Sequence, residues 1–462
     1  MAQPRVIVVG AGPAGVRCAQ TLVEAGLKPI LIEEGRRDGG QIYRRQPEGF
    51  KRPYTALYGT EAAKAEDLHR SFEALRQKID YRPGTLAWSV TAGTLHVVHD
   101  HTHTEALRFD ALVACSGATD RLMPVEGWNL AGCYSLGAAQ ISLKSQACAI
   151  GRRVVFMGTG PLLYLVASQY VKAGAKVLAV LDTSAFSRRL RALPALAARP
   201  DVLIKGMMLT SALRKAGVAV HTGVTPLRIK GTPEAGVQGV VVRDSKGREL
   251  DFDCDAVSLG YHLRAETQLA DLAQCEFRFD AESRQWLPKI DVDGRSSVAG
   301  VYLAGDGARI LGADGAEAAG RLAALAVLSD LGHPVAQDQM TALRRTLEKM
   351  DRFRRGLLQA FPWPHEQAAT LPDAAVVCRC ETITAGELRR VVTEMGGCEL
   401  NRTKAFSRVG MGRCQGRYCG HAAAEVVAHA AGVPIEVVGR LRGQAPVKPL
   451  PMAALEATTG DA

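Results

Sequence analysis

Four cysteines near the end of the chain stand in two close pairs. Cys378 and Cys380 form a C-x-C pair, and Cys414 and Cys419 form a C-x4-C pair further along. Four thiolates brought together by a small module can hold zinc or an iron–sulfur cluster. Structural zinc usually shows C-x2-4-C spacing in both pairs, and C-x-C is too tight for that pattern. We therefore predict a [2Fe–2S] cluster on these cysteines, with zinc or four unliganded thiols as the alternatives.

The segment around the second pair, residues 401–420, contains basic side chains and no acidic ones. Positive charge and free backbone amides near the sulfurs would offset the negative charge of a cluster and raise its reduction potential. The basic residues are Arg402, Lys404, Arg408, Arg413 and Arg417. Between the two pairs, residues 384–395 have a helical pattern, and Thr384 with Glu387 predicts a capping box at its start.

A glycine-rich loop follows the first apolar segment of the chain, residues 6–9, and precedes a helical pattern over residues 16–22. In such a loop the first glycine allows a tight turn, the second lets the backbone approach a pyrophosphate, and the third lets helix and strand pack closely. The helix N-terminus favours the negative charge of the phosphates. The residues predicted to line this dinucleotide site are Gly10, Gly12, Pro13, Ala14 and Gly15.

Further contacts to the same ligand are predicted after the next strands. A second strand over residues 28–32 ends at acidic residues that can accept hydrogen bonds from an adenosine ribose. A glycine pair then suits a close pass of the backbone by a bound cofactor. The buried strand over residues 110–115 ends in a turn of small residues. The predicted contacts are Glu33, Glu34, Gly40, Gln41 and Gly117.

A second unit of the same type begins at residue 152. Gly158 and Gly160 stand in the loop, but the third glycine position is Leu163. The helix therefore cannot approach the strand as closely, which weakens the case for a pyridine nucleotide and leaves the fold intact. The following strand ends at Asp182, which would favour an unphosphorylated ribose. Gly158 and Gly160 remain candidate cofactor contacts.

The chain then returns to the first unit. A buried strand over residues 300–304 ends in Gly305 and Asp306, and a helix follows over residues 316–328. An aspartate just past a parallel strand, with a helix N-terminus beside it, can hold the ribityl hydroxyls and phosphate of a flavin. Gly305 and Asp306 complete the predicted first site.

This order of elements resembles the two-dinucleotide-domain flavoprotein disulfide reductase superfamily over about residues 4–330. The resemblance implies FAD in the first unit and NAD(P)H in the second, inserted unit. Superfamily members that reduce disulfides carry a C-x-x-C or C-x4-C pair beside the flavin. No two cysteines before residue 378 stand at that spacing. Disulfide reductase activity is therefore not expected.

The cysteine-rich end resembles the bacterioferritin-associated-ferredoxin-like [2Fe–2S] domain, with C-x4-C where the small ferredoxin has C-x2-C. Together with residues 401–410 and the loop 158–163, this variant is similar to one group over essentially the whole chain. The group comprises the nucleotide-binding alpha or A subunits of opine oxidases, hydrogen cyanide synthase, D-hydroxyproline dehydrogenase and related dye-linked proline dehydrogenases. In this group the missing third glycine is a shared trait.

The resemblance implies an electron-transferring subunit of a heteromeric complex. The amino-acid or opine substrate is oxidised on a D-amino-acid-oxidase-like beta subunit with its own FAD, in some complexes with FMN at the subunit interface and a further small iron–sulfur subunit. The first site of the alpha subunit holds FAD, NAD or an adenine mononucleotide. We find no catalytic residue in this chain, since neither His262 nor His365 has a named partner. The alternatives are a self-sufficient NAD(P)H-dependent reductase and a non-catalytic scaffold.

The elements that must position these residues form an α/β fold. We expect two Rossmann-like dinucleotide-binding domains, the second inserted in the first, and a small helical [2Fe–2S] module. The expected FAD-type domain covers 1–148 and 265–335, and the inserted NAD(P)-like domain covers 149–264. A basic helix and linker (336–372), the [2Fe–2S] domain (373–440) and a tail (441–462) follow.

Bulk composition excludes several classes. The chain has 462 residues, 47% of them hydrophobic, with 5% aromatic and a net charge of +10. The positive charge is spread over helices in which acidic residues alternate with arginine, and few aromatics are present, so nucleic-acid binding is not expected. No apolar run reaches the length of a membrane span, and no signal peptide is recognisable. We expect a cytoplasmic protein, or one bound to a membrane through a partner.

Overall fold

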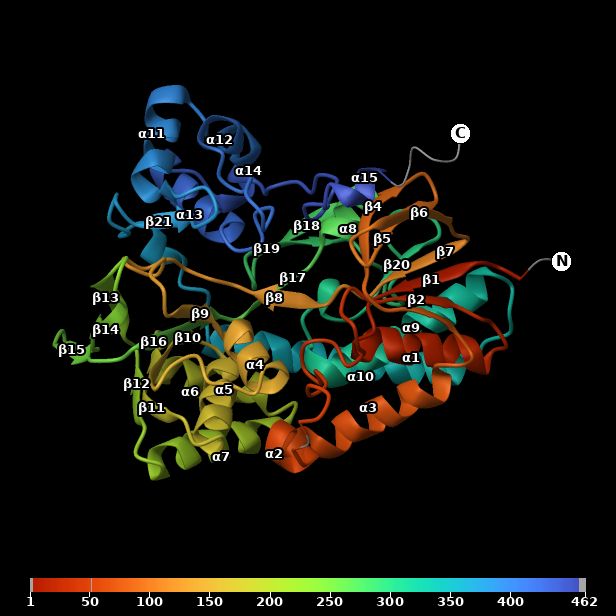
Figure 1. Cartoon of the computed structure of the whole chain (residues 1–462), viewed down its shortest axis with the longest axis horizontal. Helices are drawn as coiled ribbons and strands as arrows, with labels where there is room; N and C mark the ends of the chain where they lie inside the picture. Colours follow the sequence, from red (N-terminus) through yellow and green to blue (C-terminus); the bar gives the residue numbers. More distant parts are fainter. Residues whose placement is uncertain (1–2, 51, 457–462) are drawn as a thin grey trace.

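The computed structural model describes residues 3–50 and 52–456. Two α/β units lie side by side, and a helical module that contains the cysteine pairs lies above the second unit in the view of Figure 1. The first unit is built on a five-stranded parallel sheet with the order β20-β7-β1-β2-β3. Its strands are β1 (Val6–Val9), β2 (Ile30–Ile32), β3 (Asp80–Arg82), β7 (Ala111–Ala114) and β20 (Val301–Leu303).

Alternation along β1 explains the layers of this unit. Val6 and Val8 pack against helices α1 (Pro13–Glu24), α3 (Ala62–Leu75) and α9 (Gly312–Asp330). Ile7 and Val9 point to the other face, where an antiparallel meander covers the sheet. Strands buried on both faces are apolar throughout, which is what the sequence 6–9 shows. The meander strands are β4 (Thr85–Thr91), β5 (Thr94–His99) and β6 (His103–Arg108).

The second unit repeats the plan with a parallel sheet of order β12-β11-β10-β16-β9. Val154 and Phe156 of β10 face the helices, and Val155 and Met157 face a second antiparallel sheet. The strands of the parallel sheet are β9 (Cys133–Ser135), β10 (Arg153–Thr159), β11 (Lys176–Asp182), β12 (Ala219–Thr222) and β16 (Ala256–Tyr261). The covering elements are α4 (Leu136–Ser145), α5 (Pro161–Lys172), α6 (Phe186–Leu196), α7 (Pro200–Lys215), β13 (Thr225–Thr232), β14 (Gly236–Arg243) and β15 (Glu249–Phe252).

A two-stranded antiparallel ribbon joins the two units. The chain leaves the first sheet through β8 (Ala118–Asp120) and returns through β17 (Leu263–Ala265), which pairs with it. This confirms the predicted α/β fold class, with two dinucleotide-type sheets in one chain. The domain boundaries remain predictions; β9 precedes residue 149 and yet pairs within the second sheet.

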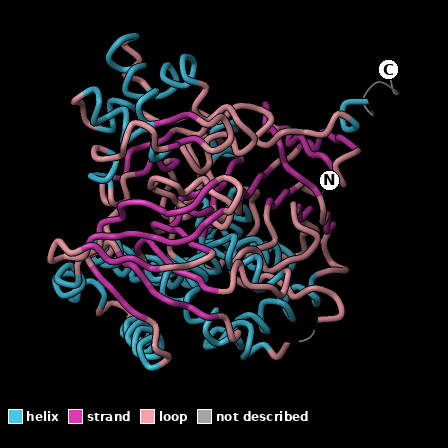
Figure 2. Tube along the Cα trace, turned by 60° about the vertical axis from the view of Figure 1, so that its left-hand side comes forward, coloured by secondary structure: helices cyan, strands magenta, loops and turns pink. Residues whose placement is uncertain are grey.

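A long helix, α10 (Gln337–Ala360), runs from the first unit to the second and packs on α6 and α9. The cysteine module follows, and Figure 2 shows its helices grouped above the strands of the two units. Its elements are β21 (Val376–Cys378), β22 (Ile383–Thr384), α11 (Ala385–Met395), α12 (Leu400–Ser407), α13 (Gly420–Ala431) and α14 (Ile435–Val438). The remaining elements are α2 (Tyr54–Tyr58), α8 (Gln268–Leu272), β18 (Phe277–Asp280), β19 (Gln285–Pro288), α15 (Ala453–Glu456) and the 3-10 turns Gly59–Glu61, Gly305–Gly307 and His365–Ala368.

The tail returns to the first unit. Val447 donates its backbone N–H to the carbonyl of Trp88, 3.0 Å away, and packs into the core between the first sheet and the meander. Lys448 pairs with Glu34. The cysteine module is therefore tied to the first unit through its own tail. Among the described helices, none has the length and apolar character needed to cross a bilayer.

Candidate functional site

The first glycine loop has the geometry that a phosphate requires. Gly10 has φ +104°, and a Cβ on Gly15 would lie 1.8 Å from the Gly10 carbonyl oxygen. Only glycine fits a helix this close to the turn. Pro13 and Ala14 form the buried first turn of α1, and no described side chain caps its N-terminus at Gly12. The first amides of α1 are therefore available to an anion.

Glu33 lies directly after β2, and its carboxylate contacts the backbone of the glycine loop. Its two carboxylate oxygens accept the backbone N–H groups of Ala11 and Gly35, each at 2.7 Å. Burial raises the pKa of Glu33 in spite of these hydrogen bonds. Each oxygen has a second lone pair, so the carboxylate can still accept a ribose hydroxyl. The neighbouring Glu34 is exposed and engaged by Lys448.

The segment after Glu34 folds onto the same loop. Gly39 donates its N–H to the carbonyl of Ala11 at 2.9 Å, and a Cβ on Gly40 would lie 2.9 Å from the Cα of Gly12. Gly40 has φ +61°, so a glycine is needed for both its conformation and its contact. Gln41 follows on the surface. The structure thus brings Gly40 against Gly12, as a shared ligand would require.

The returning segment reaches the loop from the other side. A Cβ on Gly305 would lie 2.8 Å from the Cβ of Ala14, and one on Gly320 would lie 2.0 Å from the carbonyl oxygen of Ala14. These contacts place Asp306 beside the start of α1. Its Oδ1 accepts the N–H groups of Leu311 and Gly312, and burial raises its pKa. Asp306 is therefore held at the start of α9, next to the loop.

The second glycine loop has a different environment. Gly158 has φ +146°, and a Cβ there would lie 1.8 Å from the carbonyl oxygen of Gly260. Leu163, at the third position, is fully buried in the core between β10 and its helices. The ring of His262 lies over Gly160, with Nδ1 3.4 Å from the position of a Cβ. The bulky third residue is thus accommodated, and a histidine ring covers the middle of the loop.

Asp182, the acidic residue after β11, is fully buried and surrounded by donors. Its Oδ1 accepts the hydroxyl of Thr159 and both the N–H and the hydroxyl of Ser184, at 2.7–2.9 Å. Its Oδ2 accepts the hydroxyl of Tyr164 at 2.7 Å and the guanidinium of Arg189 at 2.6 Å. With these donors in place, the carboxylate has no acceptor position left for a ribose.

The linker after α10 also packs against the second glycine loop, through Phe361. The ring of His262 shares a hydrogen bond with the carbonyl of Phe361, and the Arg189 guanidinium lies 4.8 Å from the centre of the Phe361 ring. Burial, followed by the charge of Arg121, lowers the pKa of His262 to about 4. A continuous row of this chain's own side chains therefore runs from Gly160 to Asp182, where a pyridine nucleotide would lie.

The four cysteine sulfurs contact one another in a row. The Cys419 thiol lies within hydrogen-bonding reach of both Cys378 and Cys414, and the Cys380 thiol lies within reach of Cys414. Hydrogen bonding with Cys419 lowers the pKa of Cys378 to about 6 and that of Cys414 to about 5. Backbone N–H groups also point at these sulfurs, from Gly410, Glu381 and Cys380 to Cys378, and from Tyr418 and Gly416 to Cys414. This donor set fits thiolate ligands of a cluster.

The arrangement bears on the kind of metal centre. Within the described residues, no three His, Cys, Asp or Glu side chains gather as ligands of one ion. Zinc needs four ligands around a single centre, whereas a [2Fe–2S] cluster takes two thiolates on each of two irons. A Cβ on Gly412 would lie 2.2 Å from the Cβ of Cys380, so this glycine lets the two cysteine loops meet.

One salt bridge connects the cysteine module to the first nucleotide site. Arg417 donates to Glu266 at 2.8 Å and to the carbonyl of Cys414 at 3.3 Å. Glu266 donates its backbone N–H to the carbonyl of Gly117 at 3.0 Å. Burial opposes ionisation of Glu266, but the charges of Arg264 and Arg417 lower its pKa. No motif marks Glu266 in the sequence, because its role depends on contacts between distant segments.

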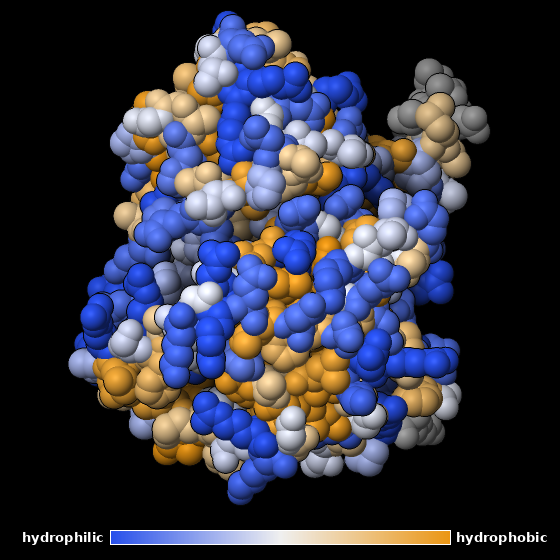
Figure 3. Space-filling view, turned by 90° about the vertical axis from the view of Figure 1, so that its left-hand side faces the viewer, coloured by the Kyte–Doolittle hydropathy of each residue, from blue (hydrophilic) through white to orange (hydrophobic). Residues whose placement is uncertain are grey.

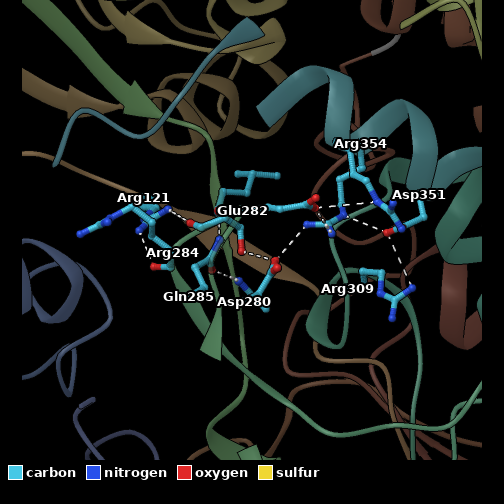
Figure 4. A network of polar contacts seen from close by, with 12 residues as sticks. Arg121, Asp280, Glu282, Arg284, Gln285, Arg309, Asp351 and Arg354 are labelled. Atoms are coloured by element: carbon cyan, nitrogen blue, oxygen red, sulfur yellow. Dashed lines mark hydrogen bonds and ion pairs between the residues drawn. The ribbon is translucent and has the colours of Figure 1, made fainter. Parts of the chain in front are cut away.

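A second network of polar contacts connects Arg121, the turn between β18 and β19, and helix α10 (Figure 4). Arg121 donates to the carbonyls of Ser283 and Arg284, and Arg354 of α10 pairs with Asp280. Arg284 in turn makes a two-pronged salt bridge to the buried Glu425 of α13, at 2.7–2.9 Å. The turn between β18 and β19 is thus held by α10 on one side and by the module on the other.

Comparisons with known proteins agree with this architecture. Residues 4–324 match the family "Pyridine nucleotide-disulphide oxidoreductase", and residues 375–459 match "Sarcosine oxidase A3 domain". The A subunit of opine oxidase from Agrobacterium tumefaciens (strain Ach5) is 38% identical over 97% of this chain and 91% of its own length. Hydrogen cyanide synthase subunit HcnB of Pseudomonas aeruginosa is 29% identical over 98% of both.

Among solved structures, L-proline dehydrogenase from P. horikoshii superposes with a TM-score of 0.68, at 19% identity, over 98% of this chain and 79% of that chain. At this identity the likeness shows the shared fold. The family match covers most of the chain, and the similarity to the opine oxidase protein extends from end to end. The chain is therefore an oxidoreductase of the pyridine nucleotide-disulphide oxidoreductase family, and it belongs to the group within it that contains HcnB and the A subunit of opine oxidase.

Proposed function

We propose that this chain is the electron-transferring, nucleotide-binding subunit of a heteromeric amine or imino-acid dehydrogenase complex. Its substrate would be D-hydroxyproline, an opine or a related amino acid, oxidised on a partner subunit that carries its own FAD. The relatives are named as subunits of opine oxidase and of hydrogen cyanide synthase, which supports a complex of several chains. The observation that carries the proposal is the row of four cysteine sulfurs, tied by Arg417 and Glu266 to the first nucleotide site.

We propose that Cys378, Cys380, Cys414 and Cys419 hold a [2Fe–2S] cluster, which would supply one-electron transfer. The first site, formed by the loop 10–15 with Glu33 and Asp306, would hold FAD or another adenine nucleotide. FMN at the interface with the FAD-containing partner, and a further small iron–sulfur subunit, complete the proposed complex. The surrounding arginines support the cluster, since positive charge raises its potential.

The geometry of the second loop weighs against a self-sufficient NAD(P)H-dependent reductase. Asp182 is saturated by donors from the chain itself, and His262 covers Gly160. A reductase must hold its pyridine nucleotide on this loop, and the acceptor that would take the adenosine ribose is already occupied by donors of the chain. A scaffold without redox function would need no row of thiols with amides directed at them. A role as an electron relay explains both observations.

The test is co-expression of the chain with a D-amino-acid-oxidase-like flavoprotein as the proposed partner subunit, followed by purification of the complex. We expect equimolar iron and acid-labile sulfide on this chain, and cluster absorption that bleaches when D-hydroxyproline or an opine is added. In Cys414→Ser the iron and the absorption should be lost while the partner's FAD is still reduced by substrate. Cys398→Ser, a cysteine in the same module but outside both pairs, is the matched control. Zinc in place of iron, or a cluster that never changes during turnover, would contradict the proposal.

A further inference from the structure

Arg264 of β17 is a buried cation at the contact between the ribbon and the cysteine module. The residue is 7% exposed, and β17 is fixed by its pairing with β8. Its Nη1 donates to the carbonyl of Arg417 at 3.3 Å, and its Nη2 donates to the carbonyl of Ala265 at 3.0 Å. Carbonyl groups orient the guanidinium but do not balance its charge. A buried charge without a counter-charge is costly, so its surroundings should supply negative charge.

Two buried arginines share one carboxylate at this place. Glu266 accepts a hydrogen bond from Nε of Arg417 at 2.8 Å, and its Oε2 lies 3.7 Å from Nη2 of Arg264. Burial opposes ionisation of Glu266, but the charges of Arg264 and Arg417 lower its pKa, so the carboxylate is ionised. In the part of the chain that the structure describes, neither arginine forms an ion pair with a second carboxylate. One positive charge is therefore left uncompensated.

The loop with the second cysteine pair lies directly against this excess charge. Arg417 stands between Cys414 and Cys419 in the sequence, and its backbone N–H donates to the carbonyl of Cys414 at 3.2 Å. The Arg264 guanidinium therefore bonds to the same turn that presents both sulfurs. Burial lowers the pKa of Arg264, whereas the charges of Glu266 and Cys414 raise it. The charges of the Cys414 thiolate and of Arg264 thus act on each other.

Most of the module's own cations are less suited to act on the sulfurs. Arg417 is compensated by Glu266, and Lys404 is the cation of the segment 401–420 that is buried without a carboxylate partner among the described residues. Charge in a buried place of low dielectric acts more strongly than exposed charge, which water and salt screen. Arg264 has such a buried place and comes from outside the module. The exposed cations of the segment are Arg402, Arg408 and Arg413.

We propose that Arg264 sets the reduction potential of the cluster held by the four cysteines, together with Glu266, which limits the positive charge at this place. The inference rests on the proposed [2Fe–2S] cluster and assigns its control to the ribbon between the two units. Uptake of one electron adds negative charge at the sulfurs, and a fixed positive charge in a place of low dielectric favours it. The ribbon therefore makes the cysteine module a better electron acceptor than the module's own side chains do.

The test is a redox titration of the full-length chain with its cluster in place, followed by electron paramagnetic resonance of the reduced form. In Arg264→Gln the equilibrium should shift about tenfold toward the oxidised form, which is about 59 mV for one electron. Arg264→Lys keeps the charge and should restore most of the potential. Glu266→Gln leaves both arginines uncompensated and should shift the potential in the opposite direction. Arg278→Gln removes an exposed arginine of β18 and should change nothing.

Opposite shifts in Arg264→Gln and Glu266→Gln cannot come from a general loosening of the module, which would move both potentials in one direction. Iron content and circular dichroism establish that each variant is loaded and folded, and Glu266→Gln alone carries the test if Arg264→Gln does not fold. An unchanged potential in both variants, or shifts of the same sign, would overturn the inference while the proposed cluster stands. An equal loss in Arg264→Lys and Arg264→Gln would also overturn it, because shape and not charge would then decide the potential. If the native chain holds no iron, the proposed cluster fails and the inference fails with it.

Discussion

At the scale of single residues, Gly15 sets how closely α1 approaches the phosphate loop. A methyl group there would meet the Gly10 carbonyl at 1.8 Å, and backbone atoms cannot move away as a side chain can. We expect Gly15→Ala to lower the free energy of unfolding by about 1–3 kcal/mol or more. The loss should appear in urea denaturation, together with weaker binding of the nucleotide in the first site.

Gly206 in α7 supplies the matched control. It is also a helical glycine, but nothing lies within 4 Å of its added Cβ. Gly206→Ala should therefore stabilise the chain by up to about 1 kcal/mol through helix propensity alone. If both substitutions destabilise equally, helix geometry and not the contact with Gly10 decides the effect.

His262 provides a pH-dependent contribution. Its pKa is lowered to about 4, below the value of about 6.5 in an unfolded chain. The unfolded state therefore binds more protons between these values, so stability is complete above pH 6.5 and falls as the pH drops to 4. The loss amounts to about 3 kcal/mol over this window. In His262→Gln the free energy of unfolding should fall by about 3 kcal/mol less than in the native chain between pH 6.5 and pH 4. The same pH dependence in both proteins would contradict the assignment.

Sequence patterns identified the residue types that could bind a ligand. They did not show which of these side chains still have open hydrogen-bond positions in the fold. Spacing alone predicted the cysteine pairs, and Glu33 was correctly placed at the end of β2. The role predicted for Asp182 depended on its acceptors being open. Two of the donors that fill them come from α5 and α6, and nothing in the sequence reveals that Tyr164 and Arg189 turn inward.

At the scale of elements, α13 is fastened to the turn between β18 and β19 by one buried carboxylate. Glu425 is 1% exposed and binds Arg284 with both oxygens and the indole N–H of Trp363 with one. Glu425→Gln removes the charge and leaves Arg284 unpaired. The expected cost is at the lower end of about 3–5 kcal/mol, because Arg284 is partly exposed. Hydrogen exchange should show faster opening of the module.

Glu394→Gln, on the exposed surface of the same module, is the control and should change stability by less than about 0.5 kcal/mol. The iron content of Glu425→Gln should remain normal as long as the module is folded. A module that opens equally in both variants would show that the salt bridge does not hold it. Loss of iron without faster exchange would point to a direct effect on the cluster.

Local rules predicted the elements whose signals lie within a few residues. The capping box of Thr384 and Glu387 is present at the start of α11, with both hydrogen bonds formed. Residues 61–79 carry an amphipathic pattern, but α3 covers only Ala62–Leu75. The ribbon of β8 and β17 could not be foreseen, since it pairs residues from opposite ends of the second unit.

At the scale of the whole molecule, the spacing of apolar residues in the sequence predicts amphipathic helices. It does not show which apolar helix faces are buried in the core of the chain and which stay exposed. Apolar side chains gather over the middle and lower part of the face in Figure 3, between hydrophilic ones. Helices α6 and α7 leave large apolar side chains exposed at helical spacing. In α6 the side chains that face the core are Ala192 and Leu196. The exposed residues are Phe186, Leu190, Leu193, Ile204, Met207 and Met208.

The arrangement of the two units also predicts how the isolated chain responds to a pyridine nucleotide. The row His262, Phe361 and Arg189 connects the linker after α10 to the second glycine loop, and Asp182 has no acceptor left for a ribose. NADH and NADPH should therefore neither bleach the visible absorption of the purified chain nor raise its melting temperature. A nucleotide present at a hundred times its Kd would add about 2.7 kcal/mol to stability, a readily measured shift. Dithionite should reduce the same sample, which shows that its cofactors are competent. Rapid bleaching by NADH would instead establish a self-sufficient reductase and exclude the relay role.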